Sequence, residues 1–327
     1  MKTYSFIGSD KNAGKTTALN FIYRGLTREM TEDRPVCLTS IGINGESVDT
    51  YEGREKPSIQ VSENTLFVTA GEHLGDLKGQ YSVLHVFAGP DFKKPFVLAR
   101  SQTGFPVVLE GPNERTGMIG VKEVIRRNAE QGICLIDGSI DRQFVGQPDI
   151  SDGICFALLM TSRKEQQLKA KGLLFALTLE ACTRETAERI KKQASTGGKS
   201  LLLNSAGDIL FKGDGVPALD NRLREICLDH AGVPTVLYLR GALTRSLHQF
   251  FAPFKKLKIV LDNFTLYQNI TTHPGGRERF HPELLLYHSV QLKSIFLKQD
   301  GLDLYFRLPP QIPSFNLFRD DPHEIGI

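Results

Sequence analysis

Lys15 and Thr16 follow Gly14 near the start of the chain, and these three residue types together can hold the phosphates of a nucleotide. A lysine ammonium at this position reaches the terminal phosphates, and the hydroxyl of the next residue binds the accompanying Mg²⁺. Glycine and small residues before the lysine let backbone amides approach the phosphate oxygens. We therefore expect the nucleotide-binding residues to be Gly8, Lys11, Asn12, Ala13, Gly14, Lys15, Thr16 and Thr17.

The segments on either side of this loop are those that a phosphate-binding loop requires. Residues 4–7 predict a short apolar strand that Gly8 ends, and apolar residues at helical spacing predict a helix over residues 17–26. The usual spacing has a glycine at position 9, where this chain has Ser9. The alternative is a glycine-rich turn between a strand and a helix. The intact lysine and threonine favour ATP or GTP, and the chain has no Asn-Lys-x-Asp element that would mark guanine.

Two apolar runs end in a carboxylate, as a Walker B strand does where it binds the metal of a nucleotide. Residues 133–137 end in Asp137, and residues 107–110 end in Glu110. Ligands of open α/β sheets lie at the carboxyl ends of the strands, beside the first loop. We therefore expect Asp137 and Glu110 to bind the Mg²⁺, directly or through water, or to take part in catalysis. The alternative for each is a carboxylate that caps the next helix or turn.

Glu46 and Asp49 lie in a loop that follows a predicted strand at residues 36–41. In P-loop proteins this segment often contacts the terminal phosphate and its metal, so both carboxylates are candidates for the metal site or for activating a nucleophile. The alternative is a solvated turn in which they cap backbone amides. The expected catalytic residues are Asp49, Glu110 and Asp137, and the expected metal ligands are these three and Thr16.

The order of the predicted elements indicates an α/β fold of the P-loop NTPase type. Continuous apolar strands at residues 105–110, 133–137 and 154–160 alternate with helices such as the one predicted at residues 118–131. Continuous rather than alternating apolar strands are typical of parallel sheets that helices cover on both faces. We therefore expect a mostly parallel sheet between two helical layers.

Residues 57–101 differ from this pattern. They contain several short strand-like runs separated by turn residues, which predicts a β-rich insertion. His73 and His85 fall within it, and neither has a cysteine, histidine or carboxylate at metal-ligand spacing. We interpret both histidines as ordinary polar residues.

The predicted domains divide the chain near residue 198. Residues 1–198 are expected to form the nucleotide-binding α/β domain, whose helical region at residues 163–194 either covers the sheet or packs against a second protomer in a homodimer. Residues 199–327 are expected to form a C-terminal α/β domain or an extension of the same sheet. Their predicted strands are at residues 201–203, 233–239 and 257–261, and their predicted helices are at residues 218–230 and 244–254.

Composition excludes several classes of protein. The chain of 327 residues is 40% apolar and 24% charged, which is typical of a globular protein. A net charge of +3 without a basic stripe does not indicate a nucleic-acid partner. The five cysteines form no C-x-x-C pair, which predicts free thiols and a reducing compartment. The longest apolar run is too short to span a bilayer, and the first strand leaves no room for a signal peptide, so we expect a cytoplasmic protein without a membrane partner.

The phosphate loop resembles that of the dethiobiotin synthetase branch of P-loop proteins, whose loop reads G-T-D-T-x-V-G-K-T. Phrases along the chain also resemble the family encoded with adenosylcobalamin-dependent lysine 5,6-aminomutase and proposed as its reactivase subunit. They are residues 11–17, residues 38–42 with Gly45, Glu46 and Asp49, residues 109–112, residues 136–138 with Asp141 and Arg142, and residues 241–244. The resemblance implies an ATP-dependent helper that releases damaged cobalamin from the mutase, together with a partner ATPase. It also implies nucleotide contacts at Lys15 and Thr16 and an acidic cluster of Glu46, Asp49, Glu110 and Asp137.

Two functions from different classes follow. The first is an accessory ATPase that changes the conformation of a partner enzyme, with the cobalamin-dependent aminomutase as the candidate. The second is a ligase or kinase of the dethiobiotin synthetase type, in which ATP phosphorylates a small carboxylate. The second function requires an additional anion site near the loop, which Lys11, Arg115 or Arg142 could supply.

Overall fold

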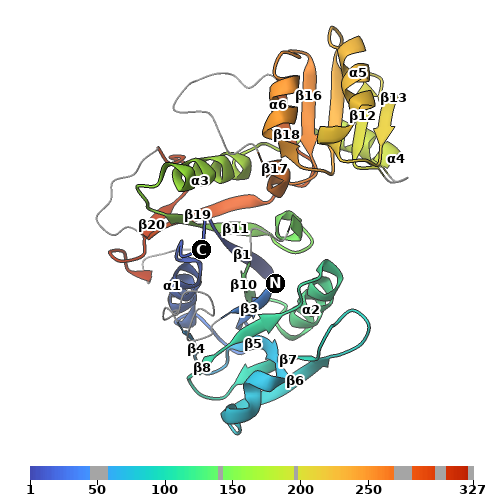
Figure 1. Cartoon of the computed structure of the whole chain (residues 1–327). Helices are drawn as coiled ribbons and strands as arrows, with labels where there is room; N and C mark the ends of the chain where they lie inside the picture. Colours follow the sequence, from blue (N-terminus) through green and yellow to red (C-terminus); the bar gives the residue numbers. More distant parts are fainter. Residues whose placement is uncertain (45–57, 139–142, 195–197, 269–281, 299–306, 323–327) are drawn as a thin grey trace. The chain divides into compact units, whose positions relative to one another are not determined.

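The computed structural model describes residues 1–44, 58–138, 143–194, 198–268, 282–298 and 307–322. The chain divides into two compact units (Figure 1). Unit 1 contains residues 1–145, 149–162 and 291–327, and unit 2 contains residues 146–148 and 163–290. Unit 1 is built on a nine-stranded sheet and unit 2 on a five-stranded sheet.

The sheet of unit 1 has the order β20-β19-β11-β1-β10-β2-β5-β7-β6. Every neighbouring pair from β20 to β5 is parallel, and β7 and β6 are antiparallel. Helices α1 (Lys15–Thr27) and α2 (Arg115–Asn128) lie on opposite sides of this sheet (Figure 1). A mixed α/β fold with a large, mostly parallel sheet between helices is therefore confirmed. The strands are β1 Lys2–Gly8, β2 Val36–Ser40, β5 Leu66–Ala70, β6 Tyr81–Phe87, β7 Phe96–Ser101, β10 Ile133–Asp137, β11 Gly153–Leu159, β19 Gln291–Lys298 and β20 Ser314–Asn316.

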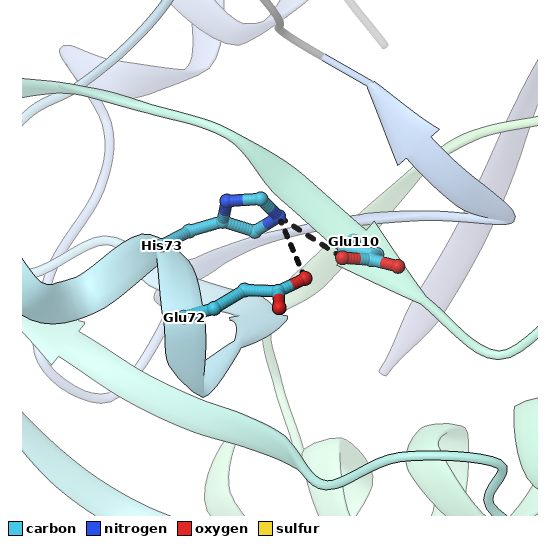
Figure 2. A group of neighbouring side chains, drawn as sticks. All are labelled: Glu72, His73 and Glu110. Carbon is cyan, nitrogen blue, oxygen red and sulfur yellow. Dashed lines mark hydrogen bonds and ion pairs between the residues drawn. The ribbon is translucent and has the colours of Figure 1, made fainter.

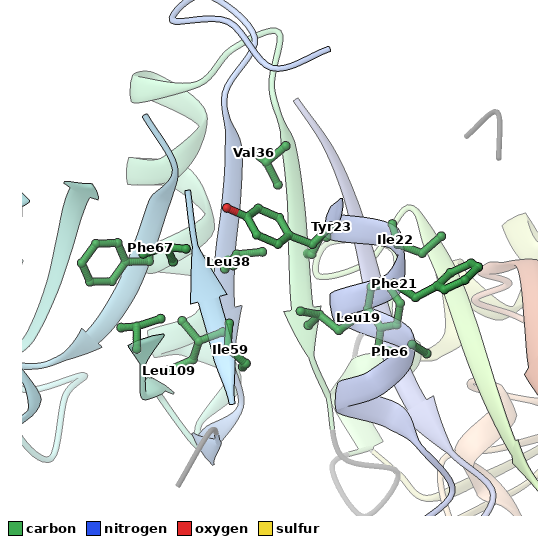
Figure 3. Close-up of a cluster of buried hydrophobic side chains, with 14 of the residues drawn as sticks. Phe6, Leu19, Phe21, Ile22, Tyr23, Val36, Leu38, Ile59, Phe67 and Leu109 are labelled. Atoms are coloured by element: carbon green, nitrogen blue, oxygen red, sulfur yellow. The ribbon is translucent and has the colours of Figure 1, made fainter. Parts of the chain in front are cut away.

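Helix α1 packs its apolar side onto the strand that precedes it and onto the neighbouring strands. Leu19 and Ile22 of this helix are buried in one hydrophobic cluster with Phe6 of β1 and Leu38 of β2 (Figure 3). The cluster fixes the direction of α1 against the sheet, and hence the position of the loop that joins β1 to α1. The predicted helix at residues 17–26 is confirmed, with two more residues at its start and one at its end.

The C-terminal segment completes this core through Phe296 of β19, which is fully buried. Its ring centroid lies 6.2 Å from that of Phe6, 6.0 Å from that of Phe21 and 5.6 Å from that of Phe315. Residues 291–298 are thus part of unit 1 because β19 pairs in parallel with β11 and fills the space beside α1.

Phe296→Ala should lower the free energy of unfolding by about 3–5 kcal/mol, because the lost ring leaves a cavity between α1 and the sheet. Urea denaturation measures this change. Phe318→Ala is the matched control, because Phe318 is 60% exposed and its loss should change the free energy by less than about 0.5 kcal/mol. Equal losses in the two variants would contradict the packing described for β19.

The predicted β-rich insertion is largely a continuation of the main sheet. β5 pairs with β2, β7 pairs with β5, and β6 forms the outer edge in the described part of the chain. A short 3₁₀ helix, η1 (Gly71–Leu77), follows β5 directly. This helix begins where a parallel strand ends, and it carries His73.

Residues 105–110 do not form the predicted strand of the parallel sheet. β8 (Phe105–Val107) pairs with β4 (Ile59–Val61), and β9 (Leu109–Gly111) pairs with β3 (Gly42–Asn44), in both cases antiparallel. Pro106 gives a physical reason, because proline has no N–H to donate and is confined to strands with an open side. Residues 107–110 are therefore not a Walker B strand of the main sheet, contrary to the prediction.

Unit 2 has its own sheet, in the order β13-β12-β14-β16-β18. The C-terminal half of the chain therefore does not simply extend the first sheet. The helical region at residues 163–194 is two helices, because α3 ends at Leu177 and α4 starts at Arg184. The elements are α3 Lys164–Leu177, α4 Arg184–Ala194, β12 Ser200–Asn204, β13 Ile209–Gly213, η3 Pro217–Leu219, α5 Asn221–Asp229, β14 Thr235–Leu239, β15 Leu243–Thr244, α6 Arg245–Phe251, β16 Leu257–Leu261, η4 Phe264–Leu266, β17 Tyr267–Gln268 and β18 Glu283–Leu286.

The two units do not follow the boundary predicted at residue 198. Unit 2 takes both helices of residues 163–194, and residues 291–327 return to unit 1. The return has a clear cause, since β19 and β20 extend the parallel sheet beyond β11. A sequence pattern of alternating strands and helices cannot show which sheet a late strand joins.

The cysteines are free, as predicted, and all but Cys182 are buried. Burial raises the pKa of the Cys155 thiol to about 12 and has the same effect on Cys227. These two thiols are therefore protonated at neutral pH. Across the described residues, no helix has the length and hydrophobicity needed to cross a bilayer.

Candidate functional site

The loop between β1 and α1 turns tightly over the end of the parallel sheet. Asn12 and Gly14 have φ angles of 60° and 87°, in the left-handed region that asparagine and glycine adopt most easily. The amide of Ala13 donates to the carbonyl of Asp10 at 3.3 Å, and Ala18 donates to Gly14 at 2.8 Å. These turns bring the chain from the end of β1 to the first residue of α1, which is Lys15.

Ser9 occupies the position where the common motif has glycine, and its side chain is buried. Its amide donates to the carbonyl of Ala157 at 2.9 Å, and its hydroxyl oxygen accepts from the amide of Leu159 at 2.9 Å. The serine therefore ties the start of the loop to β11. Gly8 is at the tight point, because a Cβ there would lie 3.2 Å from both the Ala13 Cβ and the Asp10 carbonyl oxygen. Steric crowding therefore explains why the glycine of this loop is at position 8 and not at position 9.

Lys15, Thr16 and Asp137 meet at the carboxyl end of the sheet. Lys15 Nζ lies 2.8 Å from Asp137 Oδ1 and donates to the carbonyl of Gly138 at 2.6 Å. Thr16 Oγ1 donates to Asp137 Oδ2 at 3.2 Å. Asp137 ends β10, which pairs in parallel with β1 so that Asp137 lies opposite Phe6. Strand β10 therefore positions the carboxylate, and the start of α1 positions the lysine and the threonine.

The carboxylate of Asp137 is fully buried, whereas the side chain of Lys15 is 30% exposed. Within the described residues, Asp137 Oδ1 receives no hydrogen bond of ordinary geometry, although it has the Lys15 ion pair. The lysine therefore offsets the charge of the carboxylate, and Oδ1 retains the capacity to accept another ligand. A buried carboxylate beside a threonine hydroxyl is a donor set that suits Mg²⁺, which binds oxygen. The residues present therefore fit this ion.

The surroundings of the loop are suited to an anion. The first turn of α1 contains no acidic residue, and its amides carry the positive end of the helix dipole. Lys298 of β19 packs its aliphatic chain against the loop, because a Cβ on Gly14 would lie 3.2 Å from Lys298 Cδ. Lys298 could not be predicted as a neighbour of the loop, because it is far from Gly14 along the chain.

The other predicted loop residues have varied exposure. Lys11 and Asn12 are exposed, Ala13 is buried, and the residues from Gly14 to Thr17 are half-buried. Glu46 and Asp49 lie outside the described residues, as does Arg142. Arg115 forms an ion pair with Asp149.

Glu110 belongs to a different group of side chains (Figure 2). Its Oε2 lies 3.0 Å from His73 Nε2, and its Oε1 lies 2.8 Å from Lys94 Nζ. Among the described residues it thus contacts His73 and Lys94 rather than Lys15 and Asp137. The contact of His73 with Glu110 could not be predicted from the sequence, because the two residues are 37 positions apart and lie on different elements, η1 and β9. The neighbouring carboxylate of Glu72 is the local feature that could have indicated a metal-binding role for His73.

Comparisons with protein-family models, with curated proteins and with solved structures find no significant match for this chain.

Proposed function

We propose that this chain is a P-loop protein that binds ATP with Mg²⁺ and hydrolyses it. The observation that carries this proposal is the meeting of Lys15, Thr16 and Asp137 at the carboxyl ends of β1 and β10. A lysine and a threonine at the start of a helix, beside a buried strand-end carboxylate, are the groups that a nucleotide and its metal require.

The topology supports the same proposal. β10 lies directly beside β1, and the loop between β1 and α1 turns over the end where both strands finish. Ligands of parallel α/β sheets bind at this end. The charges of the site suit a nucleoside triphosphate with its metal, since Lys15 supplies a cation and Asp137 a carboxylate at the start of a helix that has no acid in its first turn.

In this mechanism each residue has a defined task. Lys15 would pair with the terminal phosphates in place of Asp137, because a phosphate carries more charge than the carboxylate. Thr16 and Asp137 would hold the Mg²⁺, whose charge would stabilise the phosphates during transfer. The amides of the loop and of the first turn of α1 orient the phosphate oxygens. Asp49 remains a prediction as the group that activates the attacking water, whereas Glu110 contacts His73 and Lys94.

We further propose that hydrolysis serves a partner enzyme, with an adenosylcobalamin-dependent aminomutase as the candidate and a second ATPase as its companion. The partner role is supported by the short sequence motifs in which the chain resembles the reactivase family. The experiment is phosphate release with Mg²⁺ and ATP, measured alone and then with the mutase. Stimulated turnover together with corrinoid release is the expected result, and turnover that the mutase leaves unchanged would contradict the accessory role.

One observation favours the second candidate function, phosphorylation of a small carboxylate. Lys298 adds a cationic side chain beside Gly14, and Lys11 on the loop is exposed. Arg115 is less suited, since Asp149 already pairs with it. Incubation with radiolabelled ATP and a panel of small carboxylates tests this function. A labelled carboxylate product would favour it, and release of inorganic phosphate alone would exclude it for that panel.

A further inference from the structure

Two carboxylates and one imidazole lie close together in unit 1, from Glu72, Glu110 and His73 (Figure 2). Their ligand atoms all lie within 4.8 Å of one another. His73 Nε2 lies 3.0 Å from Glu110 Oε2 and 4.0 Å from Glu72 Oε1. Zinc bonds of about 2.0–2.2 Å hold neighbouring ligand atoms roughly 3–3.5 Å apart. Glu72 Oε1 pairs with Lys94, and a small rotation of this 62% exposed side chain away from Lys94 would complete the set.

Rigid elements position the two inner groups. His73 lies in η1, which follows the parallel strand β5 without a break. Glu110 lies in β9, opposite Ile43 of β3, and its side chain is only 6% exposed. Ligands on a strand and on a helix that starts at a strand end keep their geometry better than ligands on long loops.

A cationic group already sits at this point. Lys94 Nζ lies 2.6 Å from Glu72 Oε1 and 2.8 Å from Glu110 Oε1. The two carboxylates thus form a place where positive charge is stable, and this observation is independent of the histidine. The side chain of Lys94 is 35% exposed, so its ammonium can withdraw into water when another cation arrives.

We propose that Glu72, His73 and Glu110 bind a divalent transition-metal ion, with Zn²⁺ as the ion that fits best. An imidazole nitrogen with two carboxylate oxygens suits zinc and its neighbours, whereas magnesium prefers oxygen alone. Three protein ligands leave one position open to water or to a substrate. The proposed metal site contains none of Lys15, Thr16 and Asp137, so it can be tested independently of ATP binding.

Metal binding changes the protonation of the histidine and the charge of the site. Nε2 of His73 binds the metal only without a proton, so a proton on Nε2 is released to water when the metal binds. The two carboxylates neutralise the charge of the ion. Lys94 then adds an uncompensated positive charge nearby, and it acts as a competitor that limits affinity.

Titration calorimetry of the full-length, nucleotide-free protein with Zn²⁺ tests the proposal. We expect one ion per chain. His73→Ala should weaken binding by about 100-fold or more, because a direct ligand is lost. His85→Ala is the matched control, since His85 is an exposed histidine of β6 that packs on Phe87. This control should bind Zn²⁺ as the wild type does.

Lys94→Met makes the test sharper. Without the competing ammonium, Zn²⁺ should bind about tenfold more tightly, and the ion should raise the melting temperature of this variant more than that of the wild type. The spectrum of bound Co²⁺ should lack the thiolate charge-transfer band, which separates this site from the cysteines. No binding by either the wild type or Lys94→Met would overturn the proposal, as would binding that His73→Ala leaves unchanged.

Discussion

Lys15→Ala should lower the affinity for ATP by roughly 10- to 150-fold, because hydrogen bonds to charged groups contribute about 1.5–3 kcal/mol and the phosphates lose a direct cation. Equilibrium binding of a fluorescent ATP analogue in the presence of Mg²⁺ measures this loss. Wild-type affinity in the variant would contradict the assignment of the loop.

The same substitution should also lower stability, and this effect needs a control. Asp137 is fully buried, and Lys15 provides the positive charge that offsets its carboxylate. Removing the lysine should therefore lower the free energy of unfolding by about 1–3 kcal/mol. The double variant Lys15→Ala with Asp137→Asn removes both charges. It should regain most of the stability in urea denaturation without regaining the affinity. If affinity returned with stability, Lys15 would be a structural residue only.

Asp137→Asn should retain ATP and lose Mg²⁺-dependent hydrolysis, with a turnover at least about 100-fold lower, because a preorganised electrostatic contact to the metal is gone. The amide can still accept from Thr16, so the local structure should persist. Lys15 no longer pairs with a carboxylate, so binding of ATP without Mg²⁺ should be at least as tight as in the wild type.

Phosphate release and analogue binding, each measured in Mg²⁺ and in EDTA, separate these effects. The wild type should bind more tightly in Mg²⁺ than in EDTA, and Asp137→Asn should show no such difference. Glu123→Gln is a suitable control, since Glu123 pairs with Arg126 and Arg127 on the surface of α2. Wild-type turnover by Asp137→Asn would remove this carboxylate from the site.

The sequence predicted the centre of the site because the relevant signals are local. A strand, a tight loop and a helix lie within the first 27 residues, and the apolar run that ends in Asp137 is continuous. Parallel strands finish at one edge, so a strand-end acid is brought to the loop by topology alone. The Asp137 contact with Lys15 and Thr16 agrees with this expectation.

The sequence could not predict what depends on long-range pairing. Glu110 resembles Asp137 as the acid that ends an apolar run, yet Pro106 diverts that run into antiparallel pairs with β4 and β3. The contact of Glu110 with His73 depends on this pairing. Lys298 reaches Gly14 because β19 returns to the first sheet after the whole of unit 2. Local periodicity carries no information on either arrangement.

Titration of the wild-type protein with a fluorescent ATP analogue, in Mg²⁺ and again in EDTA, tests the central claim most directly. The site described at Lys15, Thr16 and Asp137 predicts saturable binding of one nucleotide per chain, competed by ATP and tightened by Mg²⁺. Absence of saturable binding, or binding that ATP does not compete, would contradict the claim that this loop holds a nucleotide.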